Sequence, residues 1–365
     1  MLTKTGKSIF LSKPKKTVKA VPIMLLILGV LVICTLTGCA GTSSENIKEA
    51  FMQIEDLQYE EALQTLETAR LIGEDERLVY RGMGIANLGL GNYETAVENF
   101  ETALKASDGV VSDMDFDLNF YLATAYFKMG KKEESAKIYD NILAIEPENK
   151  DALYLRGVIY AQEDNLDKAM ESFDAAISIA PEDYDMLINI YCILADKGYK
   201  DVGQNYLRVA METGTKKMSN YEKGQISFYM EDYESARTYL EKAKDEEGYE
   251  AVLFLGKTYE TLGDVNYAIS VYSGYITSGK ESPEVLNQMG LCKLKMEDYE
   301  GALLAFQQAM NIEGNGMMQT LRFNEIVAYE YIGDFKKACV LMESYLASYP
   351  DDEDAKREYE FLKTR

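Results

Sequence analysis

The fold of this chain is decided by one stretch, Gly91-Asn92-Tyr93-Glu94-Thr95-Ala96-Val97-Glu98-Asn99-Phe100-Glu101-Thr102-Ala103-Leu104. Apolar residues follow its small residue Ala96 after four and seven positions, and these offsets lie on one face of a helix. The turn signal Leu90-Gly91-Asn92 comes just before, and Gly84 lies twelve positions before Ala96. The stretch therefore predicts the second helix of a pair, in which a small residue lets the first helix approach closely.

The same pattern returns along the chain at intervals of 32 to 39 residues. Its small position is filled by Ala62, Ala96, Ser135, Ala169, Val202, Ala236, Ala268, Ala302 and Ala338. A period of about 34 residues is the signature of stacked helix pairs. Such arrays present long surfaces to partners, so this spacing favours binding over chemistry.

The repeated unit resembles the tetratricopeptide repeat family. Asp232-Tyr233-Glu234-Ser235-Ala236 and Asp298-Tyr299-Glu300-Gly301-Ala302 are partial copies, and prolines fall where the family often ends a repeat, at Pro147, Pro181 and Pro350. The resemblance implies an all-α fold, a right-handed superhelical solenoid of about nine helix-turn-helix repeats over residues 45–351. Residues 352–365 read as a charged helix that caps the last repeat.

The first 38 residues have the features of an export signal. They contain six lysines and no acidic residue, and an almost wholly apolar run extends from Val21 to Leu36. The ending Leu36-Thr37-Gly38-Cys39 resembles a bacterial lipobox, in which the signal is cut before the cysteine. We therefore expect a lipoprotein signal peptide over residues 1–38, a lipid on Cys39, and a short tether over residues 39–44.

An uncleaved signal anchor is the alternative, because the apolar run is close to the length needed to span a bilayer. Either interpretation places the repeats on the extracytoplasmic face of a cell membrane. The sequence leaves the type of envelope open.

Composition argues against several classes of function. The net charge of −23 disfavours nucleic acid, whose phosphates need a basic surface. This acidity is explained either by solubility or by recognition of a basic partner. The chain has no histidine, which removes the commonest general base and most catalytic zinc sites. We expect no enzymatic activity, no cofactor and no metal site.

Two features that look functional have simpler interpretations. The run Asp113-Met114-Asp115-Phe116-Asp117 begins like a calcium loop, but Leu118 and Thr124 stand where such a loop needs Gly and Glu. Three cysteines lie within the repeats, and we interpret them as small packing residues. They are Cys192, Cys292 and Cys339.

The resemblance also implies a binding face, because the first helix of each repeat lines the inner surface in this family. Aromatic residues at the exposed positions of these helices are the candidate groove-binding residues. They are Phe120, Phe127, Tyr154, Tyr184, Tyr191, Tyr221, Phe228 and Tyr229. Polar groups lie among them, namely Arg81, Lys128, Gln162, Gln225 and Lys257. Such a face could hold an extended peptide or a helix, although the same rings could instead pack between adjacent repeats.

Two functional hypotheses follow. The favoured one is a lipid-anchored scaffold that binds a protein or peptide partner in an envelope, secretion, pilus or cell-wall complex. The alternative is a glycan- or solute-binding lipoprotein that uses the tyrosine-rich groove. Insertions in solenoids often map to binding loops, so the long segment Lys105–Asp115 and the loose junction Gly314-Asn315-Gly316 are further candidates.

Overall fold

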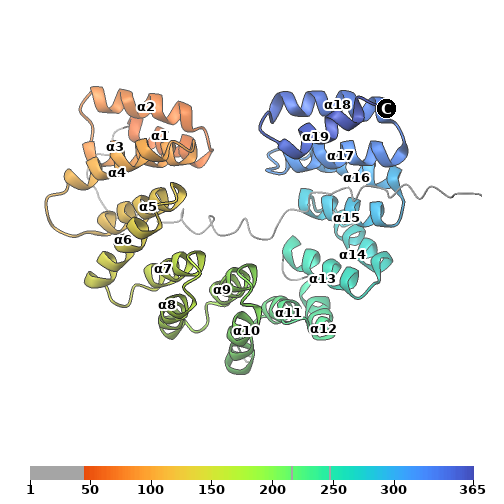
Figure 1. The fold of residues 1–365 in the computed structure, drawn as a ribbon, viewed down its shortest axis with the longest axis horizontal. Helices are drawn as coiled ribbons and strands as arrows, with labels where there is room; N and C mark the ends of the chain where they lie inside the picture. Colours follow the sequence, from red (N-terminus) through yellow and green to blue (C-terminus); the bar gives the residue numbers. More distant parts are fainter. Residues whose placement is uncertain (1–44, 215–216, 246–247) are drawn as a thin grey trace, which may run out of the picture. The chain divides into compact units, whose positions relative to one another are not determined.

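A computed structural model describes residues 45–214, 217–245 and 248–365, and the part of the chain that it describes contains nineteen helices and no strand (Figure 1). This confirms the predicted all-α class. In chain order the helices are α1 (Glu45–Glu55), α2 (Tyr59–Leu71), α3 (Glu76–Gly89), α4 (Tyr93–Lys105), α5 (Asp113–Lys128), α6 (Lys132–Ile145), α7 (Lys150–Gln162), α8 (Leu166–Ile179), α9 (Tyr184–Asp196), α10 (Lys200–Gly214), α11 (Asn220–Tyr229), α12 (Tyr233–Ala243), α13 (Tyr249–Thr261), α14 (Val265–Thr277), α15 (Pro283–Lys295), α16 (Tyr299–Met310), α17 (Met318–Ile332), α18 (Phe335–Ser348) and α19 (Glu353–Leu362). None of these described helices has the length and apolar character required to cross a bilayer.

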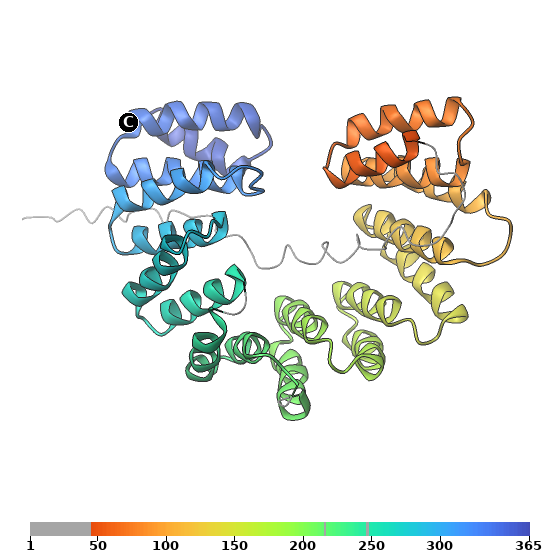
Figure 2. The same cartoon turned by 180° about the vertical axis from the view of Figure 1, so that it is seen from behind.

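The helices form two compact units, residues 45–213 and residues 214–365. Within each unit, consecutive helices pair as first and second helix of a repeat, and second helices pack against the first helix of the next repeat, as α2 does against α3 and α12 against α13 (Figures 1 and 2). First helices also touch one another, as α1 touches α3 in one unit and α11 touches α13 in the other. Each unit therefore has a layer of first helices and a layer of second helices.

Glycines in the first helices make room for large rings from the second helices. A Cβ atom added to Gly84 would lie 2.3 Å from the ring of Phe100, and one added to Gly256 would lie 2.1 Å from the ring of Tyr272. Both rings are fully buried. The small residue predicted twelve positions before the marker in many repeats thus has a direct role in these two, because it lets an aromatic side chain fill the space between paired helices.

The fifth repeat corrects the predicted register by one residue. Gly203, and not Val202, occupies the marker position, because its N–H donates to the carbonyl of Tyr199 at 3.1 Å, just as Ala96 donates to Asn92. In this repeat the sizes are exchanged. Tyr191 stands where seven of the other first helices have a small residue, and a Cβ on Gly203 would lie only 3.2 Å from the Cα of Tyr191.

The turn between first and second helix is the same in all nine repeats. One residue in each turn has a positive φ, a conformation that favours glycine. These residues are Leu57, Gly91, Gly130, Asp164, Gly198, Glu231, Gly263, Glu297 and Gly333. In several repeats an aspartate then begins the second helix, as Asp298 does by accepting a hydrogen bond from the N–H of Gly301.

Helix α19 lies against the last helix pair. Ala355 and Leu362 of α19 are buried in the same apolar cluster as Met342 and Tyr345 of α18. The hydroxyl of Tyr345 donates to Asp352 at 2.7 Å, just before α19 begins. The helix therefore covers apolar surface that no further repeat would bury.

Candidate functional site

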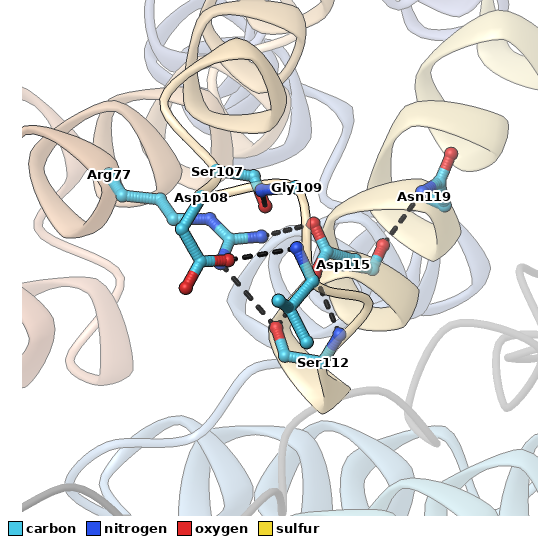
Figure 3. Close-up of polar contacts among 8 residues, drawn as sticks. Arg77, Ser107, Asp108, Gly109, Ser112, Asp115 and Asn119 are labelled. Atoms are coloured by element: carbon cyan, nitrogen blue, oxygen red, sulfur yellow. Dashed lines mark hydrogen bonds and ion pairs between the residues drawn. The ribbon is translucent and has the colours of Figure 1, made fainter.

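The long segment between α4 and α5 is held by its own polar contacts (Figure 3). The backbone N–H and the hydroxyl of Ser112 both donate to Asp115, at 2.8 and 2.7 Å, and fix the start of α5. Arg77 of α3 forms an ion pair with Asp115 from the neighbouring repeat. Arg77 and Ser112 therefore both bind the carboxylate of Asp115. This aspartate of the calcium-like run thus has a structural role at the start of α5.

The second aspartate that such a metal loop would use is also engaged. The guanidinium of Arg81 donates to Asp117 at 2.6 Å. Among the described residues no group of histidine, cysteine, aspartate and glutamate side chains is arranged to hold a metal ion.

The tip of this segment displays two apolar side chains. Val110 and Val111 are 68% and 55% exposed. The carboxylate of Asp108 accepts a hydrogen bond from the N–H of Val110 at 2.9 Å (Figure 3), so the tip has a defined turn.

In the unit of residues 45–213, three of the predicted aromatic residues are half-buried. The ring of Phe120 lies 5.8 Å from that of Tyr139, and the ring of Tyr154 lies 6.1 Å from that of Phe173. Burial raises the pKa of Tyr154 above its ordinary range. Phe127 packs beside the same apolar cluster as Phe120. These rings therefore contribute to the packing and to the surface at once.

Tyr184 and Tyr191 differ from the expectation of an exposed position, because only 6% and 8% of these residues is accessible. The shifted register of the fifth repeat is the reason. Counted from Gly203, Tyr191 falls at the helix–helix contact and Tyr184 at the first position of the repeat. Neither is a groove position in this register, and the expected exposure of both side chains is wrong. Their role in binding stays a prediction.

In the unit of residues 214–365, the other three predicted residues come together around a fourth ring. Phe254 of α13 lies 6.1 Å from Tyr221, 5.6 Å from Phe228 and 5.8 Å from Tyr229, all measured between ring centroids. All three of these partners come from α11, the first helix of the preceding repeat. We call these four residues the α11–α13 aromatic cluster.

Phe254 was missed by the sequence analysis because it stands one position beyond an expected groove position. Its neighbour on the next turn of α13 is Lys257, whose ammonium nitrogen lies 5.9 Å from the centroid of the Phe254 ring. Burial lowers the pKa of Lys257, although Glu260 acts in the opposite direction. A cation therefore stands beside the aromatic cluster.

Glu260 is the centre of a polar network that joins three helices. Its carboxylate accepts hydrogen bonds from Tyr272 at 3.2 Å, from Gln288 at 2.9 Å and from Lys295 at 2.6 Å. Burial alone would raise the pKa of Glu260, but the hydrogen bonds from Lys295 and Gln288 hold it below its ordinary value. Cys292 lies beside Glu260, and burial raises the pKa of its thiol, as expected for a packing residue.

One hollow of the surface lies away from the predicted aromatic residues. It has a volume of about 530 Å³ and is lined by Gln319, Tyr349 and the acidic stretch from Asp351 to Asp354. None of the predicted aromatic residues lines it.

Comparison with known proteins identifies the repeat. Models of the tetratricopeptide repeat match residues 120–184 and residues 219–246. The chain is 22% identical over 261 residues to BBSome complex member BBS4 from Bos taurus, across 66% of this chain and 49% of that protein. It is 38% identical over 56 residues to Tetratricopeptide repeat protein 14 from Mus musculus, across 15% of this chain and 7% of that protein. The chain thus spans about half the length of the first of these curated relatives and less of the second.

Among solved structures, a tetratricopeptide repeat protein from Parabacteroides merdae aligns with 78% of this chain and 97% of its own, at 15% identity and a TM-score of 0.45. Proteins built from these repeats are generally scaffolds without catalytic activity, and they bind peptide or protein partners. The matched stretches lie in both units, and we conclude that the chain contains tetratricopeptide repeats.

Proposed function

We propose that this protein is a lipid-anchored scaffold that binds a protein partner on the extracytoplasmic face of a cell membrane. The observation that carries the proposal is the set of half-buried aromatic rings on the first helices of tetratricopeptide repeats, foremost Tyr221, Phe228 and Tyr229 around the buried ring of Phe254. Large rings with a polar edge are frequent anchors in protein interfaces. An envelope, secretion, pilus or cell-wall complex is the setting that we favour.

The charge of the chain gives the partner a further property. With 61 acidic residues against 38 basic ones, the protein attracts a basic molecule over long distances and repels an acidic one. We therefore expect association with the partner to slow markedly as salt is added. A glycan or small solute would show no such dependence, which separates the two hypotheses.

The scaffold hypothesis is tested by capture from detergent-solubilised native membranes, with the chain from Ala40 onward as bait. A variant carrying Phe127→Ala and Tyr221→Ala removes two aromatic rings from the first helices. The matched control carries Leu304→Ala and Val340→Ala, two exposed apolar residues on the second helices α16 and α18. All three proteins must give the same helical circular dichroism.

We expect one discrete protein to be captured by the wild type and the control and lost from the first-helix variant. Equal capture by all three would place the interface away from the first helices. Capture of nothing, together with binding to an array of cell-wall glycans, would favour the alternative function.

The anchoring hypothesis rests on Cys39, which lies outside the described residues. In cells that express the full chain, Cys39→Ser should abolish incorporation of an alkyne-labelled fatty acid and leave an uncleaved precursor. Cys292→Ser is the control, because Cys292 is buried in the repeats. Labelling that persists in Cys39→Ser would contradict the lipoprotein hypothesis.

A further inference from the structure

The first repeat exposes two adjacent apolar side chains where its second helix ends. Leu71 is the last residue of α2 and Ile72 follows it, and they are 71% and 65% exposed. Both lie beyond the buried face of α2, which ends at Ala69. The ends of α6 and α8 each expose one large apolar residue, Ile145 and Ile179. We call Leu71 and Ile72 the α2 tip, a small apolar surface on an acidic chain.

Backbone hydrogen bonds fix the conformation of the α2 tip. The N–H of Gly73 donates to the carbonyl of Arg70 at 3.2 Å, and the N–H of Glu74 donates to the carbonyl of Ala69 at 3.0 Å. Gly73 has a φ of 79°. These are the two hydrogen bonds of a Schellman motif, which ends a helix with a residue in the left-handed conformation. The two apolar side chains are therefore presented by a well-defined backbone.

The α2 tip lies beside the start of α1. The side-chain amide of Asn46 donates to the carboxylate of Glu74 at 2.7 Å, and the N–H of Ile47 donates to the same carboxylate at 3.3 Å. Glu74 stands two residues after Ile72. The exposed pair is thus held at the end of the repeat where α1 begins, at Glu45.

The short tether keeps this end of the repeat close to the expected lipid. Glu45 is the sixth residue after Cys39. A fully extended chain spans about 3.3–3.6 Å per residue, so Glu45 lies within about 20 Å of Cys39. Helix α2 has 13 residues, and its opposite end, near Leu57, lies about 20 Å further along the repeat. A lipid on Cys39 therefore brings the α2 tip, and not the opposite end, next to the bilayer.

We propose that Leu71 and Ile72 insert into the bilayer that holds the lipid anchor, and that they set which end of the first repeat faces the membrane. The inference rests on the proposed function, because it requires the lipid on Cys39. A lipid chain binds a membrane stably when a second membrane-binding element supports it. The contact is apolar, because the adjacent Asp75 and Glu76 gain nothing from anionic headgroups.

Photo-crosslinking to lipid tests the inference on the full chain, purified from the membranes of cells that express it. The protein is reconstituted into phosphatidylcholine vesicles that contain a lipid with a diazirine group on its acyl chain. After irradiation, trypsin cleaves at Arg70 and Arg77 and releases residues 71–77, which contain the α2 tip. The same digest releases residues 49–70 from the rest of the first repeat, and residues 39–48 report the lipid on the cysteine.

A double variant removes the apolar character of the α2 tip, and a second double variant serves as the matched control. The first carries Leu71→Gln and Ile72→Gln. The control carries Met52→Gln and Leu57→Gln, because these apolar residues of the same repeat are 64% and 70% exposed but lie toward its opposite end. All proteins must give the same helical circular dichroism.

We expect residues 71–77 of the wild type to be labelled about tenfold more strongly than residues 49–70. This labelling should fall about tenfold in Leu71→Gln/Ile72→Gln and stay at the level of the wild type in the control. A tenfold change is at the lower end of what the burial of one aliphatic side chain contributes.

The inference and the function on which it rests fail in different ways. Equal labelling of the two peptides, or undiminished labelling of residues 71–77 in Leu71→Gln/Ile72→Gln, would overturn the insertion of the α2 tip and leave the lipid anchor intact. The absence of lipid on the peptide of residues 39–48 would overturn the anchoring function, and this inference with it.

Discussion

At the scale of single residues, Gly256 and Tyr272 behave as one unit, because the ring occupies the space that a side chain on residue 256 would need. We predict that Gly256→Ala destabilises the protein by about 1–3 kcal/mol, the usual cost of overpacking a core. Urea unfolding measures the change. Gly274→Ala is the control, because Gly274 is also helical and nothing lies within 4 Å of its added Cβ. That variant should gain about 0.5–1 kcal/mol, and equal effects at both positions would contradict the packing argument.

The buried carboxylate of Glu260 gives a second prediction, which concerns the stability of the protein at low pH. Its pKa is lower in the folded chain than in the unfolded chain, so its stabilisation is complete above the ordinary value of 4.5 and is lost as the pH falls through the folded pKa. Glu260→Gln should therefore be less stable than the wild type at pH 7, and the difference should shrink in acid. Thermal melts from pH 7 to about pH 3 test this. Glu343→Gln, at an exposed position on α18, should show no such convergence.

Individual residues also mark the limit of what the sequence could predict. Periodicity found the marker in eight repeats but chose Val202 over Gly203, because a period of about 34 tolerates a shift of one. The exchange of sizes between Tyr191 and Gly203 misled the prediction, since a tyrosine in a first helix resembles a surface residue until its partner is known. Phe254 was missed for a similar reason, because three rings of another helix give it its role.

At the scale of elements, the turns inside the repeats carry a measurable strain. Leu57, Asp164, Glu231 and Glu297 adopt a positive φ that costs a residue with a side chain about 1 kcal/mol. We predict that Glu297→Gly stabilises the protein by about 0.5–1 kcal/mol, since the relief exceeds the added freedom of the unfolded chain. Chemical denaturation gives the value. The reverse change Gly263→Ala, in the preceding repeat, should destabilise by a similar amount, and a loss of stability in Glu297→Gly would refute the argument.

The helices were the part of the structure that the sequence predicted best, because paired helices follow from local periodicity. The segment between α4 and α5 shows the limit of such prediction. Its length was evident, but its anchoring by Arg77 depends on a contact between residues 38 positions apart, which no local pattern reveals. The polar network around Glu260 was invisible for the same reason, since it joins side chains from three helices.

At the scale of the whole molecule, repeat arrays transmit stability only between neighbours. Deletion of residues 353–365 exposes apolar surface on α18, including Met342 and Tyr345. We predict a loss of about 2–4 kcal/mol from the last repeats, from the burial of a few apolar side chains. Amide hydrogen exchange should accelerate in α17 and α18 and remain unchanged in α1 to α4. A chain ending at Leu362 is the control, and faster exchange throughout would show that the array unfolds as one cooperative block.

The exchange of sizes in the fifth repeat has a consequence for how such a chain can be rearranged. Seven of its helix pairs place a small residue on the first helix, but α9 brings a tyrosine and α10 compensates with a glycine. Whole pairs can therefore be duplicated or transplanted, because each carries both halves of the fit. A crossover between α9 and α10 would join two large residues or leave a void, so recombination is permitted at the borders of this repeat and penalised at its centre.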